Sequence, residues 1–291
     1  MIPGLVLIDK PEGFTSHDVV ARIRKVAGTR RVGHAGTLDP MATGVLVLGV
    51  ESATKLLTFI VGADKTYEAT IRLGAATITD DRESEFVSKA TVEQVAQVPD
   101  EAIASAITKL TGNIEQVPSS VSAIKVDGVR SYAKVRSGEE VKLKARPVTV
   151  SRFDLVGGPK RTAEFIDVDV IVDCSSGTYI RALARDLGDL LGIGGHLTAL
   201  RRTRVGGYTI DMASSLPEPG DELKVIDSFE ASKAFQQLEL TEQQVIDLRH
   251  GKRIENPERM KGDIAAVHQG KLIAFLESTG KQLKSQVVFN D

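Results

Sequence analysis

The chain has 291 residues, of which 42% are apolar and 26% are charged, a balance typical of a folded globular protein. Its single cysteine, Cys174, excludes an internal disulfide and a thiolate metal cluster, and its net charge of −2 excludes a strongly basic chain. No apolar stretch approaches the roughly 20 residues of a membrane-spanning helix, so we expect a cytoplasmic protein without membrane contact.

The first fifty residues predict two buried strands that flank a helix and a loop. Residues 5–9 (LVLID) and 45–48 (VLVL) are the strands. The helix is expected to begin at Ser16 as its N-cap and to end at Gly28. Residues 33–44 contain three glycines and follow neither the helical nor the strand period, so we expect a loop between core elements, where chemistry is often placed.

Strands and helices alternate irregularly in the middle of the chain. Residues 66–73 and 163–174 alternate as strands do, whereas 100–110 and 178–191 have helical spacing, with Asp100 as the cap of the former. There is no regular βαβ repeat in this pattern. The expected fold class is therefore α+β, with a mixed or antiparallel sheet.

A domain boundary is predicted where two prolines and a glycine gather in residues 214–220. Residues 1–220 would then form one domain and residues 221–291 a small β-rich module. Short strands are expected in that module at 263–267, 271–277 and 286–289.

Asp39 lies within the glycine-rich loop. A lone loop aspartate is ordinarily a turn or cap residue, because its carboxylate bonds its own backbone. Around Asp39, however, five segments occur in a characteristic order: 10–18 (KPEGFTSHD), 33–44 (GHAGTLDPMATG), 65–67 (KTY), 118–125 (PSSVSAIK) with Gly128 and Tyr132, and 176–181 (SGTYIR). Together they resemble the TruB-type pseudouridine synthases over about residues 1–210. One departure is 77–84 (TITDDRES), which lacks the glycine expected after its acidic pair.

The resemblance implies a pseudouridine synthase catalytic domain, an RNA-contacting insert at about 119–150, and a PUA-like RNA-binding module at 221–291. It also implies an isomerase that flips uridine 55 out of the T loop of tRNA and converts it to pseudouridine, with an accompanying tRNA-folding activity. The T arm of tRNA is the expected partner. No cofactor, metal or obligate protein partner is expected.

Three residues take catalytic roles by this resemblance. Asp39 would be the carboxylate that acts at the ribose as nucleophile or base. Arg181 would be its basic partner and hold it in the anionic form, although without the motif a surface helix arginine would be expected. Tyr67 would lie beside the extruded base, whereas a strand tyrosine is ordinarily half-buried core.

Further residues are implied to contact substrate: Lys10, His34, Tyr179 and Leu200. Lys10 would order the loop, the alternative being a solvated turn lysine. A histidine in a glycine-rich loop could be a metal ligand, but no other metal-ligating side chain stands at ligand spacing to His34. By the resemblance, His34 would instead fill the gap that the flipped uridine leaves in the RNA loop. Tyr179 would line the site or pack on the sheet. The candidates for phosphate contact are Lys134, Arg136, Lys142, Lys144, Arg146, Arg201, Arg202 and Arg204.

Positive charge gathers in residues 1–79 and 119–210, which also hold the motifs, and a local basic surface can attract phosphate whatever the net charge. Two other functions remain open. The chain could be an RNA-binding folding factor that needs no catalysis. It could also be a hydrolase that uses Asp39, although a glycosidase usually needs two placed carboxyl groups and the motifs place no second acid for that role. The short chain favours a stand-alone enzyme over an RNA-guided relative.

Overall fold

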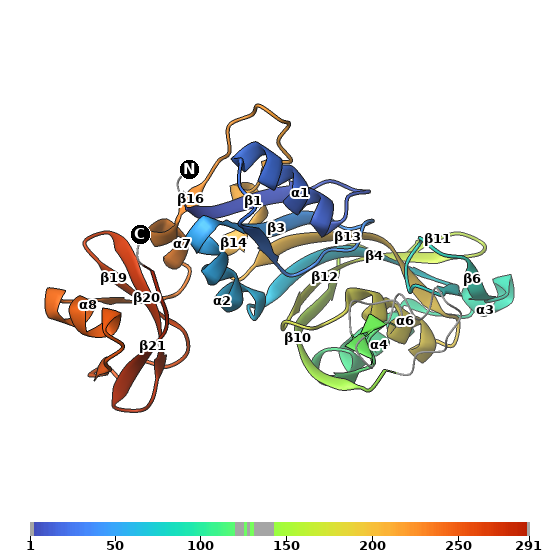
Figure 1. The fold of residues 1–291 in the computed structure, drawn as a ribbon. Coiled ribbons are helices and arrows are strands. Elements are labelled where there is room, and N and C mark those ends of the chain that lie inside the picture. The colour runs from blue at the N-terminus through green and yellow to red at the C-terminus, as the bar shows by residue number, and fades with distance from the viewer. Residues whose placement is uncertain (1–2, 120–124, 127–128, 131–142, 290–291) are drawn as a thin grey trace. The chain divides into compact units, whose positions relative to one another are not determined.

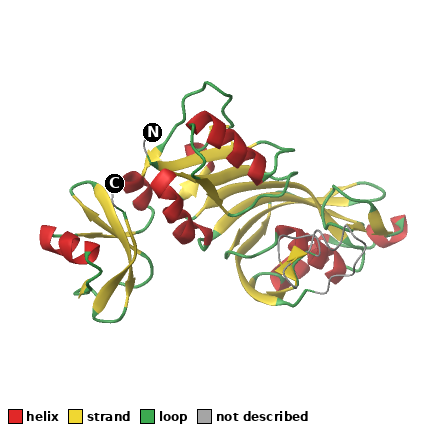
Figure 2. Cartoon of the chain, in the orientation of Figure 1, coloured by secondary structure: helices red, strands yellow, loops and turns green. Residues whose placement is uncertain are grey.

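The computed structural model describes residues 3–119, 125, 126, 129, 130 and 143–289. The chain divides into two compact units, which are Met1–Ala63 with Arg204–Asp291 (unit 1) and Asp64–Thr203 (unit 2). Both units combine helices with mainly antiparallel strands (Figures 1 and 2). This architecture confirms the predicted α+β class.

Unit 1 contains three antiparallel strands near the N-terminus. β1 (Gly4–Lys10) pairs with β3 (Thr43–Val50), and β2 (Val32–Ala35) also pairs with β3. Successive strand side chains face opposite sides, and both sides of β1 and β3 are buried. One side packs against the apolar face of α1 (Ser16–Ala27). The strands predicted at 5–9 and 45–48 are confirmed, as is the end of the helix at Gly28.

Two local predictions for unit 1 are wrong. The N-cap of α1 is Thr15, whose hydroxyl accepts from the N–H of Asp18 while the Asp18 carboxylate accepts from the N–H of Thr15. Ser16 is instead the first residue of the helix. The segment 33–44 is only partly a loop, because residues 33–35 belong to β2 and pair with β3. This pairing makes them a strand although their own sequence pattern does not indicate one.

A second, five-stranded sheet of unit 1 lies towards the C-terminus. Its strand order is β17 (Gln236–Glu239), β19 (Ile264–His268), β20 (Lys271–Ser278), β21 (Gln282–Val288) and β18 (Ile254–Glu255), with helix α8 (Glu242–Arg249) beside it. The predicted strands are confirmed, the last one being longer than expected. The sheet is consistent with a PUA-like module.

This C-terminal sheet shares a hydrophobic cluster with the N-terminal strands. The fully buried ring of Phe275 on β20 stacks on Phe59, with 4.1 Å between the ring centroids, and the cluster continues to Leu5 and Leu7 of β1. The predicted boundary at residue 220 stays a prediction. The remaining elements of unit 1 are η1 (Glu51–Leu56), α2 (Leu57–Val61), β14 (Tyr208–Thr209), η2 (Ile210–Met212), β15 (Ser214–Ser215), β16 (Ile226–Asp227) and α7 (Ser228–Ser232).

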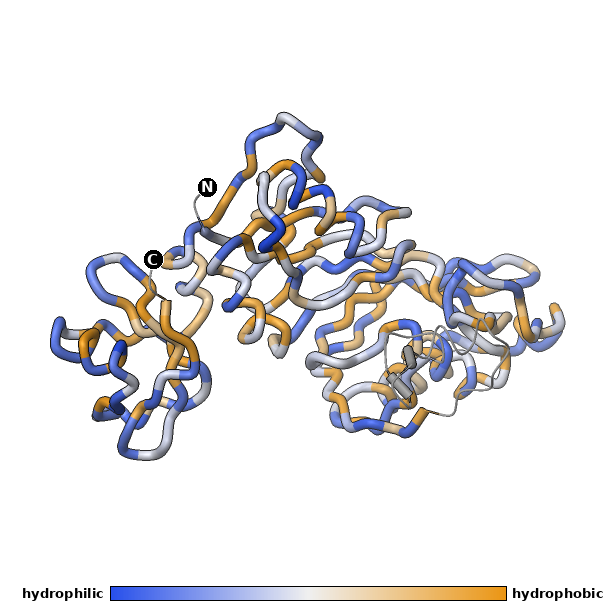
Figure 3. Tube along the Cα trace, viewed as in Figure 1, coloured by the Kyte–Doolittle hydropathy of each residue, from blue (hydrophilic) through white to orange (hydrophobic). Residues whose placement is uncertain are grey.

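Unit 2 is a sheet with helices packed on it. Its strand order is β13 (Gly195–Val205, the last two residues of which belong to unit 1), β4 (Lys65–Leu73), β12 (Ile166–Cys174), β10 (Arg146–Leu155) and β7 (Gly112–Gln116). Residues of β12 alternate between buried and half-buried, as the sequence predicts. In Figure 3 the apolar stretches largely follow the strands, and the hydrophilic stretches follow the connecting loops.

The helices predicted in unit 2 are confirmed as α4 (Asp100–Lys109) and α6 (Ile180–Leu190). The cap predicted for α4 is wrong, because Pro99 occupies the N-cap position and no side chain caps the helix. The remaining elements are β5 (Ala75–Thr77), β6 (Phe86–Lys89), α3 (Val92–Ala96), β8 (Lys125–Val126), β9 (Val129–Arg130) and β11 (Lys160–Arg161).

Helix α6 approaches the start of β13 backbone to backbone. A Cβ atom added at Gly188 would lie 2.1 Å from the carbonyl carbon of Gly194 and 2.1 Å from the nitrogen of Gly195. A side chain at Gly188 would therefore displace the helix that carries Arg181.

Candidate active site

The loop around Asp39 is held by the residues that follow β1. Asp39 is half-buried between β2 and β3. The hydroxyl of Ser16 donates to the carbonyl oxygen of Leu38 over 3.2 Å and accepts from the N–H of Leu38 over 2.9 Å. On the other side of Asp39, the carbonyl oxygen of Pro40 accepts from the N–H of Gly13 over 2.9 Å. Both peptide neighbours of Asp39 are thus fixed.

Lys10 completes this arrangement from the end of β1. Its ammonium donates to the carbonyl oxygens of Pro11 (3.0 Å), Phe14 (2.6 Å) and Pro40 (3.1 Å), and the residue is 0% exposed. A buried ammonium is tolerated only where oxygen atoms replace its water shell, and these carbonyls do so. The alternative of a solvated turn lysine is therefore wrong. The expected role of Lys10 in ordering the loop agrees with its contacts, and its contact with substrate stays a prediction.

His34 lies on β2, shortly before the loop. Its ring lies edge-on to the ring of His17 on α1, with 5.8 Å between centroids. Among the described residues, no three His, Cys, Asp or Glu side chains come together in a way that could hold a metal ion. Insertion of His34 into RNA stays a prediction.

Within the residues that the structure describes, no helix has the length and apolar character needed to span a membrane.

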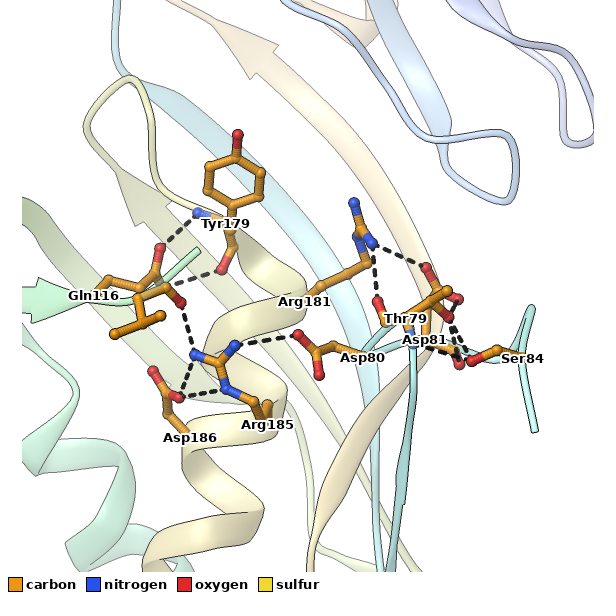
Figure 4. Close-up of polar contacts among 10 residues, drawn as sticks. Thr79, Asp80, Asp81, Ser84, Gln116, Tyr179, Arg181, Arg185 and Asp186 are labelled. Carbon is orange, nitrogen blue, oxygen red and sulfur yellow. Dashed lines mark hydrogen bonds and ion pairs between the residues drawn. The ribbon is translucent and has the colours of Figure 1, made fainter. Parts of the chain in front are cut away.

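In unit 2, Arg181 belongs to a buried polar network at the start of α6 (Figure 4). Its guanidinium donates to the carbonyl oxygen of Thr79 over 2.8 Å, and its Nη1 lies 3.5 Å from Oδ2 of Asp81. The two charged side chains are only 6% and 3% exposed. The carboxylate of Asp81 also accepts from the hydroxyl of Thr79 and from the N–H of Glu83. The alternative of a surface helix arginine is therefore wrong.

The ion pair predicted between Asp39 and Arg181 would join the two units, and it stays a prediction. Asp39 in unit 1 and Arg181 in unit 2 each lie in a part of the chain that hydrogen bonds hold in place. Asp81 falls in the segment 77–84, which departs from the family pattern, and the sequence analysis gave Asp81 no role. The missed signal was the acidic pair at 80 and 81, shortly after the strand β5 (Ala75–Thr77).

The other predicted residues of unit 2 lie on the sheet or at the helix start. Tyr67 on β4 is buried and faces Val172 of β12 in the strand register. Tyr179 precedes α6 and is half-buried, and its backbone is held by Gln116, whose side chain accepts from the Tyr179 N–H (2.8 Å) and donates to its carbonyl (3.1 Å). Leu200 is buried on β13. Their contact with substrate stays a prediction.

Lys65 and Arg202 are two cations buried in unit 2. Burial lowers the pKa of Lys65 to about 8, and the positive charge of Arg202 contributes to this lowering. Arg202 is 1% exposed, so its guanidinium is not available at the surface for phosphate. The prediction of a phosphate contact for Arg202 is therefore corrected, because its side chain lies in the interior of the protein and not at the surface.

The other candidates for phosphate contact differ in their solvent exposure. Lys144 and Arg146 are exposed, whereas Arg201 and Arg204 are half-buried. Lys134, Arg136 and Lys142 lie outside the described residues, as does Tyr132 of the fifth motif. The phosphate contacts of the described candidates stay predictions.

A basic pocket of unit 1 escaped the sequence analysis. It has a volume of about 680 Å³, lies at the end of α1, and is lined by Arg24, Lys25 and Arg30 together with Ala21, Gly28 and Thr29. Arg24 donates to the carbonyl oxygen of Val32 over 2.9 Å, which directs its guanidinium. Four cations within residues 24–31 were the signal that could have revealed this surface.

Comparisons with known proteins place these features in a family. Residues 24–180 match the N-terminal domain of the TruB family pseudouridylate synthases. Residues 181–238 match the tRNA pseudouridylate synthase B C-terminal domain, and residues 235–290 match the C-terminal domain described as tRNA pseudouridine synthase II.

Two curated bacterial relatives resemble nearly the whole chain, and both are named tRNA pseudouridine synthase B. The protein of an Arthrobacter species is 56% identical over 99% of this chain and 97% of its own length. The protein of Corynebacterium diphtheriae is 52% identical over 96% of this chain and 94% of its own length.

A solved structure described as a Cbf5-Nop10-Gar1 complex contains a chain with the same fold. It matches with a TM-score of 0.72 and 24% identity, over 98% of this chain and 84% of that chain. A second, described as an H/ACA RNP bound to a substrate RNA containing 2'-deoxyuridine, gives a TM-score of 0.71 and 23% identity, over 99% and 85% of the two chains.

Proposed function

Because this chain belongs to the TruB family of pseudouridine synthases, we propose that it converts uridine 55 in the T loop of tRNA into pseudouridine, with Asp39 as the catalytic carboxylate. It is an isomerase of the tRNA pseudouridine synthase kind. The proposal includes the T-loop position, the role of Asp39, an accompanying tRNA-folding activity and a location in the cytoplasm, where tRNA is found.

The observation that carries the proposal is the anchoring of the Asp39 loop. Catalytic groups act efficiently when their position is fixed before the substrate arrives. Hydrogen bonds hold the backbone of Leu38 and of Pro40 on either side of Asp39, through Ser16 and Lys10 respectively. Asp39 itself remains half-buried rather than sealed in the core. A fixed yet accessible carboxylate is what chemistry at a ribose requires.

The reaction is an isomerisation and needs no external donor. The bond between N1 of uracil and C1' of the ribose breaks, the uracil rotates while it is held, and a bond forms between C5 and C1'. C5 then loses its proton and N1 gains one, so the atoms balance. The carboxylate of Asp39 either adds to the sugar or removes a ribose proton, and both routes remain open.

Access to the uridine requires base flipping, because a stacked base in the folded tRNA elbow is out of reach. Tyr67 would then lie beside the extruded base, and phosphate contacts would offset the cost of unstacking. The basic pocket supports such contacts, because Lys25 and Arg30 make no ion pair with any described residue and can take phosphate as a partner.

The experiment that tests the proposal compares Asp39→Asn with the wild-type chain. Asparagine keeps the shape of the side chain but cannot act as nucleophile or base, so pseudouridine formation should fall to background. tRNA binding should stay within a few fold, because affinity comes mainly from phosphate contacts and stacking. Pseudouridine in the T arm is quantified after incubation, and filter binding is measured at fixed salt.

Two controls sharpen this test. Asp154→Asn removes the same charge from an exposed position of β10 and should leave conversion intact. A tRNA transcript with cytidine at position 55 should gain no pseudouridine. Near-normal conversion by Asp39→Asn would remove Asp39 from the mechanism, and a folded variant that fails to bind tRNA would make Asp39 a binding residue. Modification of the cytidine transcript would contradict the proposed position.

A further inference from the structure

Arg185 connects three segments of unit 2 through one side chain (Figure 4). Its Nη1 donates to Oδ2 of Asp80 over 3.2 Å, and its Nη2 donates to the carbonyl oxygen of Val117 over 2.7 Å. Its Nε and Nη2 also donate to Oδ1 of Asp186, over 2.9 and 2.7 Å. No sequence motif indicated this residue, although it stands one helical turn after Arg181 on α6, a spacing that places both on one face.

Two of these partners lie beside parts of the proposed site. Asp80 directly precedes Asp81, the carboxylate that contacts Arg181. Val117 directly follows β7, where the chain enters the insert predicted at about 119–150. Arg185 thus touches both the turn that positions Arg181 and the root of the predicted RNA-contacting insert.

The turn at Asp80 is held by the fold in an unusual conformation. Its φ angle is +59°, in the left-handed region that residues other than glycine rarely adopt. Its carbonyl oxygen accepts from the N–H of Leu197 over 3.0 Å, which ties the turn to β13. The Asp80 side chain is 10% exposed. The contact with Arg185 holds this carboxylate in place from the side of α6.

The charge of Asp80 depends in part on α6. Burial raises the pKa of Asp80. The hydroxyl of Ser119 opposes that rise most strongly, followed by the guanidinium groups of Arg185 and Arg181, whereas the carboxylate of Asp186 adds to it. These are the charged groups of α6 that face Asp80. Without Arg185, Asp80 would therefore protonate at a higher pH, and the turn would lose the anion that Arg185 holds.

We propose that Arg185 is a positioning residue for the isomerisation. Through Asp80, Arg185 couples the root of the insert, at Val117, to Arg181. The inference rests on the proposed function, since it assigns Arg185 a role in that reaction. A planar guanidinium with five donors can bond two carboxylates and a carbonyl at once, whereas the compact ammonium of lysine cannot span them. Tyr67, Asp39 and Arg181 would do the chemistry, and Arg185 would not touch the substrate.

The test uses Arg185→Gln and Arg185→Lys in the full-length chain, with the single-turnover rate at saturating tRNA and the tRNA Kd as separate measurements. We expect Arg185→Gln to lower the rate at least tenfold and to change Kd less than about threefold. Arg185→Lys should recover only part of the rate. Arg152→Gln is the matched control, because it removes an arginine of unit 2 that pairs with Asp154 and contacts neither Asp80 nor Val117, and it should stay near the wild-type rate.

The pH profile separates positioning from a merely structural role. Between pH 5 and 9, the acid limb of the rate for Arg185→Gln should move to higher pH, because Asp80 must be ionised and now protonates more easily. Adding Asp80→Asn to this variant should abolish the shift. An unchanged acid limb would overturn the proposal. A lower rate that is accompanied by a comparable fold loss of tRNA affinity and by a lower melting temperature would also overturn it.

A measurement without RNA keeps this inference distinct from the proposed function. Hydrogen exchange of the backbone at 112–119 should accelerate in Arg185→Gln and remain at the wild-type rate in Arg152→Gln. Unchanged exchange in Arg185→Gln would overturn the link to the insert root. If Arg185→Gln showed the faster exchange while the wild-type protein failed to modify uridine 55, the proposed function would fail while this link would stand.

Discussion

Ser16 and Leu38 are joined by two hydrogen bonds that run in opposite directions through one hydroxyl group. Ser16 is fully buried at the first turn of α1, and Leu38 immediately precedes Asp39. The hydroxyl thus satisfies both backbone groups of Leu38, as a neighbouring strand would do. It is free for this task because Thr15 caps the helix in its place.

Ser16→Ala should impair turnover more than tRNA binding. The change leaves the buried N–H and carbonyl of Leu38 without this partner, which costs about 1–3 kcal/mol, and it loosens the backbone next to Asp39. Urea unfolding and single-turnover rates measure the two effects. Ser151→Ala, on an exposed part of β10, is the control and should change neither. Normal turnover in a destabilised Ser16→Ala protein would show that loop order does not limit the reaction.

Lys65→Met should change how stability depends on pH. The pKa of Lys65 is about 8 in the folded chain against an ordinary value of 10.5, chiefly because of burial. Between these values the unfolded chain binds a proton that the folded chain has released. The free energy of unfolding therefore rises with pH in this window, by at most about 1.4 kcal/mol per pH unit. Below pH 8 the folded chain carries the full penalty of burying the charged ammonium of Lys65. The variant should lack this rise.

Urea unfolding at pH 7.5, 8.5 and 9 measures the effect. The series stops there because burial raises the pKa of Cys174 from 9.0 to about 11, which makes stability fall with pH in the range above pH 9. Lys109→Met, an exposed lysine of α4, is the control and should keep the wild-type slope. Equal slopes for Lys65→Met and the wild type would mean that the pKa of Lys65 is not depressed in the folded chain.

Phe275→Ala should lower the stability of unit 1 by about 3–5 kcal/mol, the usual cost of removing a buried aromatic ring. Phe275 stacks on Phe59 and is fully buried in the cluster that the C-terminal sheet shares with β1. The measurement is urea unfolding followed by two probes, one in the C-terminal sheet and one in the N-terminal strands. A loss confined to residues 221–291, with unchanged stability elsewhere, would support the predicted boundary at 220. Loss of the N-terminal strands in the same transition would contradict it.

Replacing Lys25 and Arg30 together by glutamine should weaken tRNA binding without slowing the reaction at saturating tRNA. Both side chains line the basic pocket. Each lost phosphate contact reduces the slope of log affinity against log salt by about 0.7–0.9. Filter binding at several salt concentrations measures this slope. Arg152→Gln, a cation paired with Asp154, is the control. An unchanged slope would mean that the pocket does not meet phosphate.

The sequence predicted best where a pattern is local and repeated. The alternation of β12 and the apolar spacing of α1 and α6 are direct consequences of burial on one face, so they can be recognised without a structure. Thr15 and Ser16 show the limit of such reasoning. Both are good caps, and the choice between them depends on the distant backbone of Leu38.

The network around Arg185 could not be predicted for a different reason. Its partners come from positions 80, 117 and 186, and no local period links them. The Asp80 turn offered only an acidic pair, and Val117 contributes a carbonyl that every residue type possesses. Such contacts are set by the packing of α6 on the sheet, which sequence spacing does not reveal.

The backbone contact at Gly188 has a consequence for how this chain can change over generations. Most surface positions of a helix accept many residue types, but here even the methyl group of alanine would meet the peptide between Gly194 and Gly195. The helix with Arg181 and Arg185 can therefore vary on its outer face while one inner position admits a single amino acid. A random library selected for activity should lose almost all diversity at Gly188, however freely its exposed neighbours drift.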